Sequence, residues 1–155
     1  MKHRFVQIVS FVTVLGLPAT TTLATEPGHH HEPGSASKLQ LKGGQKWPTD
    51  EALRQGMVNI RKAVTPDLPA IQRDKLNTQG YDQLAGKINA QVAYIVQNCH
   101  LEKEADAMLH LVLADIMAGA DAMAGKDKQV SRQAGALKVV QALEDYGNYF
   151  DPPGW

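Results

Sequence analysis

An apolar pattern of helical period, which recurs in four segments, is the feature that most constrains the fold of this chain. In the first segment, apolar residues recur at spacings of four, three and four, which places them on one helix face. Thr49 or Asp50 is a suitable N-cap, and Pro66 and Pro69 end the helix because proline lacks the amide and clashes with the preceding turn. The apolar residues of this segment are Leu53, Met57, Ile60 and Val64.

Three further helices are predicted over about 81–98, 102–124 and 128–149. The third begins with acidic residues that suit the positive end of the helix dipole, and Gly125 follows its end. The prolines after Asp151 stop the fourth. The residues expected in the core are Leu84, Ile88, Val92, Ile95 and Cys99, then Ala105, Leu109, Val112, Ile116, Ala120 and Met123, then Val130, Leu137, Val140, Leu143 and Phe150.

These segments predict an all-α fold, an up-down-up-down four-helix bundle over residues 47–155. No alternating, strand-like run bounded by turns competes with this interpretation. The connection over 65–79 is expected to be polar and irregular. In this topology the starts of the first and third helices and the ends of the second and fourth share one end of the bundle.

The first 24 residues have the pattern of a secretory signal peptide. A basic start is followed by an apolar run from Phe5 to Leu17, and Ala24 supplies a small residue at the expected cleavage site. A run of ~13 apolar residues is too short to span a bilayer. We therefore expect export to the periplasm and no membrane anchoring after signal removal. Residues 25–46, rich in Pro, Gly and Ser, are expected to form a disordered tail and linker that contains histidines.

Charge argues against a nucleic-acid partner. Lys2 and Arg4 are the only charged residues of the signal segment, so of 16 basic residues 14 remain, against 16 acidic residues. No basic stripe exists that could replace phosphate counterions. No complete catalytic signature is present, and we expect a protein that is not an enzyme.

The residues that suit a metal site are a methionine, the single cysteine and a histidine. Met57, Cys99 and His110 are expected near the same bundle end. Thioether, thiolate and imidazole are ligands that select soft metals, so copper is the preferred ion. By helical rotation, however, His110 lies about 120° from the core face of its helix and could point outward.

Each of these residues also has a purely structural interpretation. Free cysteine is among the most buried residue types, methionine fills cores, and a boundary histidine often pairs with a neighbour such as Asp106. Cys99 could also be half of an intermolecular disulfide or an attachment point. Covalent haem is disfavoured, because Val96 replaces the first cysteine of the Cys-x-x-Cys-His motif. His29, His30 and His31 form a second, weaker metal-capturing tract.

An accessory interaction module is the alternative from a different class. Aromatic residues are enriched at interface anchors. Trp47, Tyr149 and Trp155 are expected to gather at one bundle end, where they could meet a periplasmic protein partner without any metal.

Three further segments of the chain have a distinctive sequence. They are Lys46-Trp47-Pro48-Thr49-Asp50 continuing to Ile60-Arg61, Asn98-Cys99 continuing to Leu109-His110, and Tyr146-Gly147 with Phe150-Asp151 and Pro153-Gly154-Trp155. In these segments the chain resembles a small exported family, the DnrO-like proteins of proteobacteria. The resemblance implies a link to denitrification or nitrosative stress, with no established activity. It also adds weight to the interpretation of Met57, Cys99, His110 and Trp155 as one set of site residues.

Overall fold

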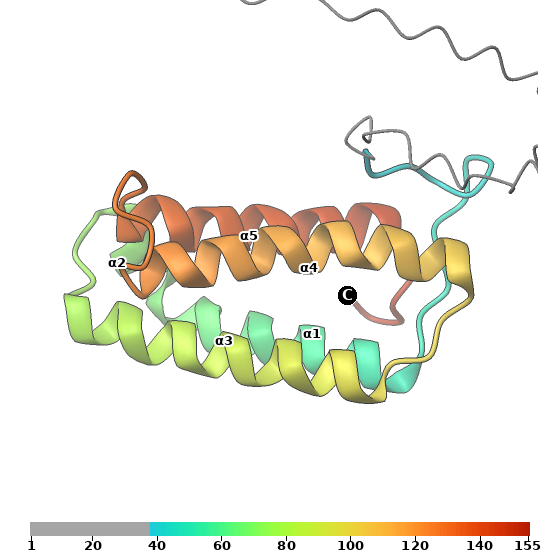
Figure 1. Ribbon diagram of the computed structural model, residues 1–155, viewed down its shortest axis with the longest axis horizontal. Helices are drawn as coiled ribbons and strands as arrows, with labels where there is room; N and C mark the ends of the chain where they lie inside the picture. Colours follow the sequence, from blue (N-terminus) through green and yellow to red (C-terminus); the bar gives the residue numbers. More distant parts are fainter. Residues whose placement is uncertain (1–37) are drawn as a thin grey trace, which may run out of the picture. The chain divides into compact units, whose positions relative to one another are not determined.

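The computed structural model describes residues 38–155 as an up-down-up-down four-helix bundle, so the predicted fold class is confirmed (Figure 1). The predicted signal peptide, and residues 25–37 of the predicted tail, lie outside the described residues. The four long helices are α1 (Glu51–Val64), α3 (Thr78–Asn98), α4 (Lys103–Met123) and α5 (Arg132–Tyr149). A 3-10 turn, η1 (Thr65–Asp67), and a short helix, α2 (Leu68–Gln72), join α1 to α3.

Side-chain caps set where three of the long helices begin. The Asp50 carboxylate accepts from the Leu53 amide at 2.7 Å, and the Asn77 and Ser131 side chains cap α3 and α5 in the same way. Each cap satisfies a backbone N–H that has no partner within the helix. For this reason α3 begins a few residues before the predicted start at 81, and α5 begins after the predicted start at 128.

The core face of α5 is made of smaller residues than the sequence pattern suggested. Val130 and Leu137 were expected in the core, but they are 39% and 40% exposed, so this expectation is wrong. Val130 precedes α5, and Leu137 lies outside the buried face of α5. That face is lined by Gly135, Ala136, Val139, Ala142, Leu143 and Tyr146.

The connection between α1 and α3 is ordered, which corrects the expectation of an irregular segment. Pro66 and Pro69 lie in the first turns of η1 and α2, where the missing amide costs no helical hydrogen bond. Ile71 of α2 is fully buried, and its carbonyl accepts from the Gln133 side chain at 2.8 Å. The connection therefore closes one end of the bundle.

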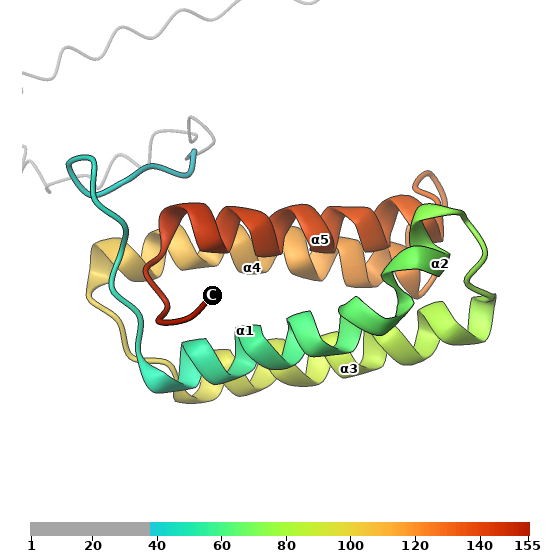
Figure 2. The ribbon, with the colours of Figure 1, turned by 180° about the vertical axis from the view of Figure 1, so that it is seen from behind.

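The segment before α1 is held against the bundle from Leu39 onward, ahead of the predicted domain start at 47. Gly43 and Gly44 both have positive φ and make a tight turn closed by two hydrogen bonds between Lys42 and Gln45. Trp47 is buried, and its backbone forms a parallel bridge with Phe150 after α5. The chain beyond Phe150 then turns back between α5 and α1 (Figure 2).

Among residues 38–155, none of the helices has the length and apolar character needed to cross a membrane.

Candidate functional site

The loop between α3 and α4 is tied to the start of α1 by Asp50. One carboxylate oxygen caps α1, and the other accepts from the His100 amide at 2.6 Å. Burial opposes ionisation of Asp50, but hydrogen bonds from the amides of His100 and Leu53 and from the Cys99 thiol lower its pKa below the usual value. The carboxylate therefore stays charged and joins the start of α1 to the α3–α4 loop, a place that we call the corner.

Cys99 lies half-buried at this corner, immediately after α3. Burial, followed by the negative charge of Asp50 and its hydrogen bond with the thiol, raises the pKa of Cys99 to about 12. The thiol is consequently neutral near pH 7 and donates to the carboxylate. A neutral thiol is neither a nucleophile nor a ready metal ligand, because both roles need the thiolate.

Tyr146 of α5 is fully buried, and within residues 38–155 its hydroxyl has no hydrogen-bond partner. Burial raises the pKa of this phenol well above its usual value. Its ring stacks on Phe150 at a centroid distance of 5.4 Å and meets the Trp155 ring edge-on at 4.7 Å. Tyr146 therefore links the core to the C-terminal segment.

His110 points away from the core. Its side chain is 68% exposed, and Nδ1 lies 2.9 Å from the Asp106 carbonyl oxygen and 3.4 Å from the Asp106 carboxylate. Met57, in contrast, has no exposed surface. Helical rotation had left the direction of His110 open, and packing decides it in favour of solvent.

The three predicted copper ligands differ in exposure: Met57 is in the core, Cys99 is half-buried after α3, and the His110 side chain faces solvent. Within the described part of the chain, no cluster of three or more His, Cys, Asp or Glu side chains could hold a metal ion. His29, His30 and His31 lie outside the described residues.

The aromatic residues of the predicted interaction surface are packed against the fold itself. Trp47 is 5% exposed, and its indole N–H donates to the Gln40 carbonyl at 2.7 Å. Tyr149 and Trp155 are partly buried and also pack against the core. These side chains therefore act first as internal contacts between the chain ends and the bundle.

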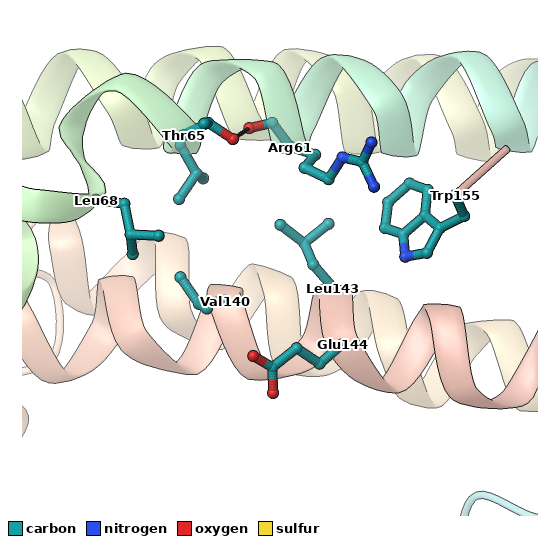
Figure 3. A pocket seen from close by; sticks show the side chains of 8 residues that line it. Arg61, Thr65, Leu68, Val140, Leu143, Glu144 and Trp155 are labelled. Carbon is teal, nitrogen blue, oxygen red and sulfur yellow. Dashed lines mark hydrogen bonds between the residues drawn. The ribbon is translucent and has the colours of Figure 1, made fainter.

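A cavity of about 280 Å³ lies between α1 and α5, beside the C-terminal segment (Figure 3). The positions of the cysteine and the histidines do not predict this cavity. The helical period predicts only that some of its lining residues are apolar. The one feature of the sequence that points to it is the tryptophan that follows the Pro-Pro-Gly segment, where the last helix has already ended. The lining residues are Arg61, Val64, Thr65 and Leu68 on one wall, and Val140, Leu143, Glu144 and Trp155 on the other.

Trp155 closes one end of the cavity. The Arg61 guanidinium lies over its ring, 4.5 Å from the centroid. On the α5 side, a Cβ added to Gly147 would lie only 2.5 Å from the indole nitrogen, so the absence of a side chain there makes room for the ring. The backbone beyond Asp151 makes no hydrogen bond within the described residues, so packing holds Trp155 in place.

Fold and cavity together define the class: an all-α four-helix bundle with an apolar cavity along one helix seam. No protein-family model, curated protein or solved structure matches this chain. The resemblance to the DnrO-like proteins therefore stays a prediction.

Proposed function

We propose that this protein is a ligand-binding bundle, exported as its sequence predicts, that holds a small apolar molecule in the cavity between α1 and α5. The observation that carries the proposal is the cavity itself, with its mainly aliphatic and aromatic lining. Small-molecule sites are mostly apolar and concave, with few polar groups that fix orientation. Binding, rather than chemistry, is the role that this lining suits.

The size of the cavity limits the ligand. A water molecule occupies about 30 Å³ of liquid, so a cavity of about 280 Å³ suits a molecule of roughly nine or ten non-hydrogen atoms. An eight-carbon chain with a polar head has this size.

A calorimetric titration of the protein with octanamide and octanoate tests the proposal. Val140→Phe fills the cavity from α5 and should abolish binding of both probes. Leu137→Phe is the matched control, because Leu137 lies on the same helix, is 40% exposed and does not line the cavity. If neither probe binds the unmodified protein, or if Val140→Phe binds as well as Leu137→Phe, the proposal is wrong.

Copper binding at Cys99 is the second candidate, and the observation that favours it is the pairing of a half-buried thiol with the Asp50 carboxylate. A metal would have to displace the thiol proton, which the raised pKa of Cys99 opposes. Anaerobic titration with Cu(I) tests it: unchanged stoichiometry and affinity in Cys99→Ala would exclude this site. The predicted link to denitrification belongs with this candidate.

A further inference from the structure

Arg61 is the one cationic side chain that lines the α1–α5 cavity. In the described part of the chain it makes no salt bridge, and its guanidinium donates no hydrogen bond. Two other arginines are engaged differently: Arg54 pairs with Glu51, and Arg132 pairs with Asp82. Arg61 instead lies over the face of Trp155, with its donors free.

We propose that the ligand of this cavity is a small amphiphilic monoanion, whose carboxylate pairs with Arg61 while its apolar part lies between α1 and α5. This inference rests on the proposed function and names its ligand class. A guanidinium presents N–H donors in a fork that matches a carboxylate. The aliphatic lining of Leu68, Val140 and Leu143 suits the hydrocarbon part, and Figure 3 shows these side chains directed into the space between the two helices.

Charge around Trp155 supports an anion at this end. The Lys46 ammonium donates to the Gly147 carbonyl at 2.6 Å, which places a second cation next to the α5 residue against which the Trp155 indole packs. Glu144 is the only acidic side chain among the lining residues, and it is exposed. In Figure 3 its carboxylate is turned away from the Arg61 guanidinium. Arg61 is therefore the lining side chain that an anionic head can pair with.

The test compares three probes of nearly equal size by calorimetry at low salt: octanoate, octanamide and octylammonium. Octanoate should bind roughly tenfold more tightly than octanamide, because a hydrogen bond to a charged group adds about 1.5 kcal/mol. Octylammonium should bind most weakly. The preference for octanoate should shrink as salt screens the exposed guanidinium.

Variants assign the preference to one side chain. Arg61→Gln should bring octanoate down to the affinity of octanamide, and Arg61→Lys should keep part of the preference. Lys62→Gln is the matched control: it removes an exposed cation one residue away that does not line the cavity, and it should leave the preference intact. Glu144→Gln should tighten octanoate binding.

The outcomes separate this inference from the proposed function. If octanamide or octylammonium binds as tightly as octanoate, or if Arg61→Gln keeps the preference, the anionic ligand class is overturned while the cavity remains a binding site. If no probe binds, or if Val140→Phe binds all three, the proposed function itself fails.

Discussion

The two seams that α5 makes with its neighbours are closed in different ways. Against α4, Gly119 and Gly135 face each other, and a Cβ added to either would lie 2.6 Å from the carbonyl oxygen of the other. The two backbones are therefore in close contact, with alanines and Val139 filling the rest of the seam. At this point of contact no space is left for a ligand.

The seam between α5 and α1 is closed by larger side chains and by the C-terminal segment. Leu143 is 6% exposed, yet a cavity of about 280 Å³ remains beside it. Trp155, which no backbone hydrogen bond fixes within the described residues, closes one end. The comparison teaches that backbone contact excludes ligands, whereas contact through side chains leaves space that a ligand can use.

Adding a methyl group to the tight seam should have the largest effect. Gly135→Ala places its Cβ 2.6 Å from the Gly119 oxygen and from Ala122 Cβ, so backbone must move. We expect a loss of about 2–3 kcal/mol in the free energy of unfolding, measured by urea denaturation. The control is Gly86→Ala on α3, which meets nothing within 4 Å and should stabilise by about 0.5 kcal/mol. Equal effects of the two changes would show that the α4–α5 seam is not tight.

A pH-dependent effect is expected from titration of Cys99, at the bundle end where α1 and α3 meet. The pKa of the folded thiol, about 12, lies above its ordinary value of 9.0, so the unfolded chain loses the proton first as pH rises. The contribution to stability is complete below pH 9 and falls between pH 9 and about 12. Denaturation curves measured across this range should show that the free energy of unfolding falls less with rising pH in Cys99→Ala than in the unmodified protein. Parallel losses would contradict a raised pKa.

Tyr146→Phe tests the side of α5 that meets Trp155. The substitution removes a buried hydroxyl that has no partner in the described structure while keeping the ring that contacts Trp155. We expect stabilisation by about 1 kcal/mol, measured by thermal unfolding, because an unsatisfied polar group is removed. A loss of stability instead would indicate that an ordered water satisfies the hydroxyl.

The smallest effect is expected for a glycine in the open seam. In Gly147→Ala the three atoms nearest the new Cβ all belong to the indole of Trp155, a side chain that packing alone holds and that can move aside. Stability should change by no more than about 0.5 kcal/mol, since the substitution also favours the helix. Tryptophan emission should nevertheless shift as Trp155 is displaced. A cost equal to that of Gly135→Ala would mean that both seams are equally rigid.

Much of the fold could be predicted from periodicity. The stripes of α1, α3 and α4 are buried as expected, including Leu53, Ile88 and Ile116, because one apolar face per helix must leave water. The helix contacts could not be predicted where small residues form them. Gly119 and Gly135 carry no hydrophobic signal, and their role depends on which helix lies opposite.

The candidate site was much harder to predict. Residue types drew attention to Met57, Cys99 and His110, but the direction of His110 and the proton on Cys99 depend on neighbours such as Asp106 and Asp50, which only the folded chain supplies. The cavity involves Arg61, Leu143 and Trp155, which come from separate segments, and nothing in the sequence predicts that these three side chains line one space.

The sequence by itself determined the number of long helices, their order and most of the core, because helical period and stop signals are local properties of the chain. Only the tertiary structure decided how close each pair of helices comes. That distance depends on which side chains from separate segments meet. It brings α4 and α5 into backbone contact at Gly119 and Gly135, and it leaves a cavity beside Trp155 between α1 and α5.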